Sequence, residues 1–203
     1  MKKTMIFCLS ILMTAGFVKT NAQTHLSYGV KTGMNLSNFI LTDLDSQTSS
    51  MKAGASLGGF MKIDLHPNFA IQPEMSFFYK TSKMEVGKLE DDFRQWGMQI
   101  PVYAVGQMPT ANGKAYFGVG PYLGIGFDAR YKDADKDLYE KVNDVAAMNR
   151  WDVGLGAMLG YEFKNGIQIN AGYQFGFVNQ LDALKDAAKM RTQTVNVGIG
   201  YRF

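Results

Sequence analysis

Residues 191–203, RTQTVNVGIGYRF, show the strictest alternation in the chain. Apolar side chains occupy every second position from Val195 to Phe203, and the positions between them are polar or glycine. A period of two indicates a strand, because successive side chains of a strand point to opposite faces. A strand of a soluble sandwich has the same alternation. An aromatic residue at the end, however, suits the headgroup region of a bilayer, so we expect a strand that crosses a membrane.

Seven further segments alternate in the same way. With the last one, the expected strands are residues 26–36, 53–65, 69–80, 94–107, 114–129, 150–163, 167–178 and 191–203. Short turns are expected at 66–68, 109–113 and 164–166, where proline, asparagine and Asn-Gly favour tight reversals. Longer loops are expected at 42–50, 81–92, 130–149 and 179–190. This regular change between short and long connections is typical of transmembrane barrels.

Two of the long loops contain apolar residues at helical spacing. Leu138, Val142 and Val145 recur at intervals of four and three, so a short helix is plausible in 130–149. Leu181 and Leu184 suggest a second one in 179–190.

The expected strands are longer than those of soluble sheets. They contain about 11 to 16 residues, whereas strands of soluble proteins usually have about 5–6. A tilted strand needs about 9–11 residues to cross the hydrocarbon core. A soluble lipocalin-type barrel would turn its apolar face inward, but the polar face here carries Gln, Asn, Lys, Glu and Asp, which would not fill a dry core. The sequence therefore predicts an all-β fold, an eight-stranded antiparallel up-and-down transmembrane β-barrel.

The beginning of the chain has the pattern of an export signal. Lys2 and Lys3 precede an apolar run, residues 5–18, that is too short to span a bilayer, and small residues follow at 20–22. We expect residues 1–22 to be a signal peptide and 23–203 to be the barrel domain. The alternative is a retained helical anchor.

Removal of the signal peptide also changes the charge of the protein. The signal contains Lys2, Lys3 and Lys19, so the mature chain keeps 18 of the 21 basic residues, which balance its 18 acidic residues. No nucleic-acid partner is expected.

Aromatic residues gather at the ends of the expected strands, as in the two aromatic girdles of a membrane barrel. With both termini in the periplasm, the periplasmic set is Tyr28, Phe69, Phe117, Phe163, Tyr201 and Phe203. The outer set is Phe77, Tyr79, Trp96, Phe127, Trp151 and Phe177.

Five short motifs in order give a resemblance to a known family. They are Gly29-x-Lys31-x-Gly33-x-Asn35-x-Ser37, Gln72-Pro73-Glu74, Ile100-Pro101, Gly120-Pro121-Tyr122 and Tyr201-Arg202-Phe203. Together they resemble the PorT-like outer-membrane β-barrel proteins of Gram-negative bacteria, over almost the whole mature chain. Gln99 departs from the pattern, since an acidic residue is expected there. The resemblance implies an eight-stranded outer-membrane barrel. Most such relatives have no established activity, and some are tied to protein secretion.

Charged residues occur on the polar faces of the expected strands. The candidate interior cluster is Lys31, Lys62, Glu74 and Arg202, and other charges expected to face inward are Asp64, Asp128, Asp152 and Glu162. The interior of an eight-stranded barrel is just wide enough for side chains to fill. Buried charges must be paired, so we expect Glu74 to pair with Lys62, with Arg202 and Lys31 meeting across the closing seam. This cluster would form a structural plug or a functional polar pocket.

No residue set for catalysis stands out. His25 and His66 are the only histidines, and both are expected at the periplasmic side. We expect no enzyme, no cofactor and no metal site, and a non-enzymatic outer-membrane protein whose long extracellular loops serve a structural, interaction or secretion-associated role. The alternatives are a small polar-ligand binder, a narrow pore and, less favoured, a lipid enzyme. Expected partners are outer-membrane lipid, the barrel assembly machinery and a protein that contacts the loops.

Overall fold

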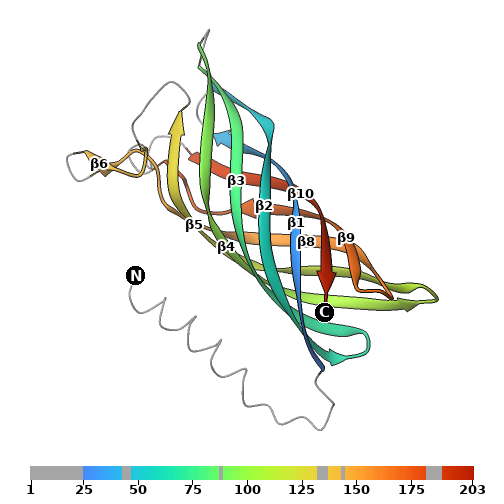
Figure 1. The fold of residues 1–203 in the computed structure, drawn as a ribbon. Helices are drawn as coiled ribbons and strands as arrows, with labels where there is room; N and C mark the ends of the chain where they lie inside the picture. Colours follow the sequence, from blue (N-terminus) through green and yellow to red (C-terminus); the bar gives the residue numbers. More distant parts are fainter. Residues whose placement is uncertain (1–24, 43–46, 87–88, 132–136, 143–144, 182–188) are drawn as a thin grey trace, which may run out of the picture.

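The computed structural model of the protein describes residues 25–42, 47–86, 89–131, 137–142, 145–181 and 189–203. The expected signal peptide, residues 1–22, lies outside the described residues. In the described part of the chain, eight long antiparallel strands close into a barrel (Figure 1) in the order β1-β10-β9-β8-β5-β4-β3-β2. They are β1 His25–Thr42, β2 Gln47–His66, β3 Phe69–Val86, β4 Leu89–Thr110, β5 Gly113–Tyr131, β8 Trp151–Phe163, β9 Ile167–Gly176 and β10 Lys189–Arg202.

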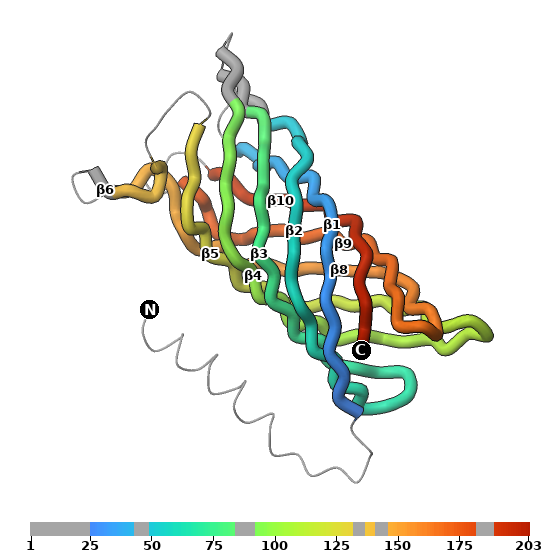
Figure 2. The backbone as a smooth tube through the Cα atoms, in the orientation of Figure 1, coloured from blue at the N-terminus to red at the C-terminus, as the bar shows by residue number. Residues whose placement is uncertain are grey.

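The barrel closes where β1 meets β10 (Figure 2). Their register is continuous from Gly29 opposite Arg202 to Thr42 opposite Lys189. The beginning of β1 and the end of β10 lie at the same end of the barrel as the three tight turns, which we name the turn end; the opposite end is the loop end. Gly166, in one of these turns, has a φ of 86°, a conformation that glycine adopts without strain. The closed eight-stranded barrel confirms the expected fold.

Strands β1 to β5 and β10 extend further toward the loop end than the alternation predicts. β3 and β4 remain paired up to Val86 opposite Leu89, so the long polar loop expected at 81–92 is wrong. Polar residues do not interrupt a ladder whose bonds are made by the backbone. Both strands therefore project beyond the body of the barrel as a hairpin, and β2 accompanies them through Gln47, which lies opposite Val86.

The helix expected in 130–149 is also wrong for the described residues of that segment. Two short strands, β6 Lys141–Val142 and β7 Val145–Ala146, pair there instead. The backbone of Leu138 bonds to distant partners, because its N–H donates to Ala129 O and its carbonyl accepts from Met148 N. Those bonds replace the contacts that a helix would make within itself. The second expected helix falls mostly on residues outside the described part, and its Leu181 forms a bridge with Met148.

The outer wall of the barrel carries mainly apolar side chains between the two aromatic girdles. All twelve aromatic side chains assigned to the two girdles are exposed on it. At the loop end the rings of Trp96 and Phe127 meet edge to face, with centroids 5.5 Å apart. Among the described residues, no helix is long and apolar enough to cross a membrane.

The inner face holds aromatic rings as well as polar groups. Phe60, Tyr103, Tyr116 and Tyr122 are all buried there. Inward-facing glycines provide the space, since a Cβ at Gly29 would overlap the ring of Phe60, and other glycines lie under tyrosine rings in the same manner. The interior is therefore packed with rings over glycines, a filling that the polar composition of this face does not reveal.

One residue expected inside faces outward. Trp96 pairs with Asp128 whereas Gly97 pairs with Gly126, so Phe127 is an extra residue in β5. Such a β-bulge inverts the alternation beyond it. Asp128 consequently lies on the outer face beside Arg130, whose Nε donates to Asp128 Oδ1 at 2.7 Å, and the inward assignment of Asp128 is wrong.

Candidate functional site: the barrel interior

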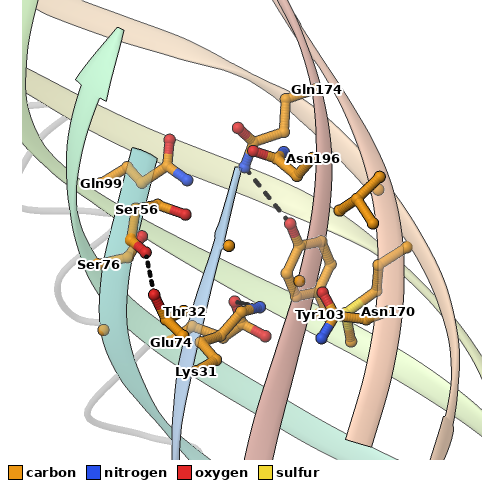
Figure 3. A pocket seen from close by; sticks show the side chains of 16 residues that line it. Lys31, Thr32, Ser56, Glu74, Ser76, Gln99, Tyr103, Asn170, Gln174 and Asn196 are labelled. Carbon is orange, nitrogen blue, oxygen red and sulfur yellow. Dashed lines mark hydrogen bonds and ion pairs between the residues drawn. The ribbon is translucent and has the colours of Figure 1, made fainter. Parts of the chain in front are cut away.

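The central part of the interior contains an ion pair between β1 and β3 (Figure 3). Nζ of Lys31 donates to Oε2 of Glu74 at 2.6 Å, and Nε2 of Gln72 donates to Oε1 of the same carboxylate at 2.8 Å. Glu74 is buried, while the Lys31 side chain keeps 24% of its surface exposed. Both oxygens of Glu74 are therefore occupied by groups of the barrel itself.

A second cluster, the Glu162 cluster, lies nearer the turn end and consists of Lys62, Glu162, Gln168 and Arg202. Glu162 lies 3.3 Å from Nζ of Lys62 and 2.7 Å from Nη2 of Arg202. Gln168 Nε2 donates to the same carboxylate at 2.8 Å. The side chains of Lys62 and Glu162 are only 1% and 2% exposed. One carboxylate thus contacts two cations and joins β2, β8 and β10.

The four residues of the predicted cluster all face the interior, but their expected pairing is wrong. Lys62 bonds to Glu162 instead of Glu74, and Lys31 and Arg202 each bond to a carboxylate instead of meeting at the seam. The ring of Phe60 occupies the position opposite Glu74 on β2. The lumen of an eight-stranded barrel is narrow enough for long side chains to reach across it, so Lys62 finds its partner on the far wall.

A third polar group, nearer the loop end, was only partly anticipated. The Tyr122 hydroxyl donates to Asp152 Oδ2 at 3.0 Å. Lys80, which the sequence analysis missed, is buried here with its ammonium 4.6 Å from the centre of the Phe78 ring. The same alternation that places Gln72, Glu74 and Ser76 inside also places Lys80 inside, because Lys80 is the last residue of the expected strand 69–80.

The free space in the interior is small. A cavity of about 40 Å³ lies beside Lys31 and Glu74. Gln99 and Gln174 line it, and the side-chain oxygen of each has no hydrogen-bond partner. A water needs about 10–15 Å³ of such space and polar partners, so a few waters fit, whereas small-molecule sites occupy about 300–1,000 Å³. Gln99, the position that departs from the family pattern, thus lines a polar cavity with room for water.

The loop end of the lumen is covered by an apolar cluster, which we name the outer cap. Its buried residues are Phe39, Phe93, Ala129, Tyr139, Met148 and Met190. The Tyr139 hydroxyl accepts a hydrogen bond from Gln95 Nε2 at 2.6 Å, and the Arg150 guanidinium lies 5.2 Å from the ring centre. Burial raises the pKa of Tyr139 to about 12, so the phenol is neutral at physiological pH. The cap joins the segment after β5 to strands β1, β4 and β10.

Metal and histidine chemistry has no support in the described part of the chain. It contains no group of three or more His, Cys, Asp or Glu side chains able to hold a metal ion. His25 and His66 both lie at the turn end, and His66 Nδ1 accepts from the backbone N–H of Asn68 at 3.2 Å.

A family model described as "Outer membrane protein beta-barrel domain" matches residues 21–182. The chain belongs to this family. It is an outer-membrane protein, and short turns of such barrels face the periplasm, so the turn end is periplasmic and the loop end extracellular.

Solved structures with the same fold include the outer membrane protein OprG from Pseudomonas aeruginosa. It is 15% identical, with a TM-score of 0.55, over 89% of this chain and 97% of that one. Neisserial surface protein A is 14% identical, with a TM-score of 0.52, over 88% of this chain and 99% of that one. No curated protein sequence matches significantly. These likenesses concern the fold.

Proposed function

We propose that this protein is a non-enzymatic outer-membrane barrel that acts through its extracellular surface, by contact with a partner protein. The observation that carries the proposal is the outer cap, which covers the lumen with packed side chains and holds Tyr139 and Met148, from the described residues that follow β5, against β1, β4 and β10. An ordered extracellular surface above a filled barrel is suited to recognition.

The extracellular surface has a second ordered part. Strands β2, β3 and β4 continue beyond the barrel body, and an ion pair between Lys52 and Asp92 joins β2 to β4 across β3. Backbone pairing of this kind preorganises a surface, which lowers the entropy cost of binding.

The interior supports a structural role for the charged cluster. Lys31, Lys62, Glu74 and Arg202 each have an ion-pair partner within the barrel, and the cavity beside them has room for water only. We propose that they plug and brace the barrel. A polar-ligand site or a pore would need a larger space or a continuous path.

We also propose that the chain belongs to the PorT-like proteins within this family. The motifs that resemble PorT-like proteins contact one another inside the barrel: Lys31 bonds to Glu74 of the Gln-Pro-Glu motif, and Pro101 lies opposite Tyr122. This supports a PorT-like architecture. We also propose contact with the barrel assembly machinery during insertion and, separately, a secretion-associated role that acts through the extracellular surface.

The test uses a photo-crosslinking amino acid in the native outer membrane. Ala147 is the probe position; it is exposed in the capping segment, by which we mean the described residues 137–142 and 145–150 between β5 and β8. The exposed Ala111 of a periplasmic turn is the matched control. We expect a discrete protein adduct from Ala147 that weakens when Gly126→Ala displaces the cap. Adducts to lipid alone, or the same adduct from Ala111, would contradict the proposal.

The pore alternative is tested separately. Purified barrel in planar bilayers should show no steady conductance, because side chains fill the lumen. A stable open channel in the unmodified protein would show that the plug assignment is wrong, and it would leave the crosslinking result to be judged independently.

A further inference from the structure

Two arginines face each other on the outer wall just beyond the extracellular aromatic girdle. Arg94 of β4 lies directly opposite Arg130 of β5, and both side chains are exposed. Directly opposite residues of an antiparallel pair have Cβ atoms about 4.5–5.5 Å apart, and like charges there destabilise the sheet. Arg130 bonds to Asp128, whereas Arg94 has no ion-pair partner among the described residues. Because Asp128 already bonds to Arg130, the repulsion between the two guanidinium groups is reduced, and a further anion beside Arg94 would reduce it more.

The β-bulge is what creates this arrangement. Because Phe127 is an extra residue in β5, Arg130 faces outward and Ala129 faces inward. Without the bulge, Arg130 would continue the inward row of Gly124 and Gly126 toward the lumen. Bulges re-aim side chains and are a recurring device beside functional sites. Here the bulge brings a second guanidinium beside that of Arg94.

The height of the pair in the membrane indicates the ligand. Trp96 lies two residues from Arg94 on the same face of β4, and its ring packs against Phe127. Aromatic belts lie at the level of the headgroups, and two residues advance a strand by about 7 Å. The arginines therefore project from the girdle toward the layer in which lipid phosphates lie.

We propose that Arg94 and Arg130 form a binding site for the phosphate of an outer-leaflet lipid. The rings of Trp96 and Phe127 would then lie on the membrane side of the phosphate, where the acyl chains of that lipid begin. Arginine binds phosphate through parallel N–H donors, and two guanidinium groups on adjacent strands can donate hydrogen bonds to the same phosphate. Asp128 competes for Arg130 and keeps the affinity moderate. The site is separate from the extracellular protein surface proposed above.

The test measures lipid binding by native mass spectrometry of the full barrel in a non-ionic detergent. The probes are phosphatidic acid and a diacylglycerol with the same acyl chains, which differ only in the phosphate. We expect tighter binding of phosphatidic acid, and a loss of about 30-fold in the double variant Arg94→Gln, Arg130→Gln. Asp128→Asn should strengthen binding, because it removes the competing carboxylate.

Lys164→Gln is the matched control, because it removes one exposed cation from a periplasmic turn. Its affinity for phosphatidic acid should stay at the wild-type value.

The double variant must fold for the comparison to hold, which heat-modifiable migration reports. If it does not fold, Arg94→Gln is tested alone, since Arg94 makes no ion pair in the described part of the barrel. Unchanged binding in the arginine variants, or an equal loss in Lys164→Gln, would overturn the proposal. Displacement of the lipid by an equal concentration of inorganic phosphate would make this a free-phosphate site and overturn the lipid assignment.

Discussion

The ammonium of Lys31 lies 2.6 Å from Oε2 of Glu74, although β2 separates their two strands in the barrel wall. The bond therefore crosses the lumen side of an intervening strand, between Gly58, which lies opposite Lys31, and Phe60, which lies opposite Glu74. Contacts of this kind depend on the curvature of a closed barrel, because in a flat sheet strands two apart lie about 9–10 Å from each other.

Glu74→Gln should lower the free energy of unfolding by about 1–3 kcal/mol, because the partly buried ammonium of Lys31 loses its charged partner. The loss stays moderate since part of the Lys31 side chain remains exposed. Urea unfolding in lipid vesicles measures it. Lys31→Met combined with Glu74→Leu should recover most of the loss, because an apolar pair has no charge to desolvate. Equal stability of Glu74→Gln and the unmodified protein would mean that the pair contributes nothing.

Glu162→Gln should be more damaging, at about 3–5 kcal/mol, because it leaves two cations without their carboxylate and one of them, Lys62, is almost fully buried. The same unfolding measurement applies. Glu140→Gln, at an exposed position of the capping segment, is the control and should change stability by less than about 0.5 kcal/mol. A similar effect of both substitutions would remove the special role of the Glu162 cluster.

Gly126→Ala should displace the outer cap without unfolding the barrel, because the new Cβ would overlap the Tyr139 hydroxyl. Limited proteolysis should then cut residues 137–150 faster, while heat-modifiable migration stays that of a folded barrel. Gly124→Ala is the matched control on the same strand, where a Cβ meets its nearest atom at 3.5 Å, an ordinary contact. If both variants resist protease equally, Tyr139 does not hold the cap in place.

Val197→Arg should destabilise the barrel by about 2–4 kcal/mol, because Val197 is 60% exposed on the outer wall and we expect it near mid-membrane. Thr42→Arg, an outward position at the extracellular end of β1 opposite Lys189, should cost about 0–1 kcal/mol. Unfolding in vesicles compares the two. An equal or reversed order would indicate that the lipid-facing surface is misassigned.

Local sequence determined the central part of each strand, the faces of its residues up to the bulge in β5, and the periplasmic turns. The alternation around Val197 and Ile199 requires one lipid-facing side, because an apolar row every second residue can be covered only by hydrocarbon or a core. The turn at Gly166 follows from Asn-Gly chemistry, since glycine alone takes a φ of 86° without strain. These features depend on residues next to each other in the chain.

The partners inside the barrel were decided only by its closure. Lys62 had Glu74 as the nearest acid on the neighbouring strand, but it bonds to Glu162, 100 positions away in the sequence. The bulge at Phe127, which turns Asp128 and Arg130 outward, is likewise set by pairing with β4 and not by the composition of β5. The outer cap needs β1, β4, β10 and the capping segment together. Period-two alternation assigns a residue to a face, but the shear and narrow width of the closed barrel determine which groups on that face meet.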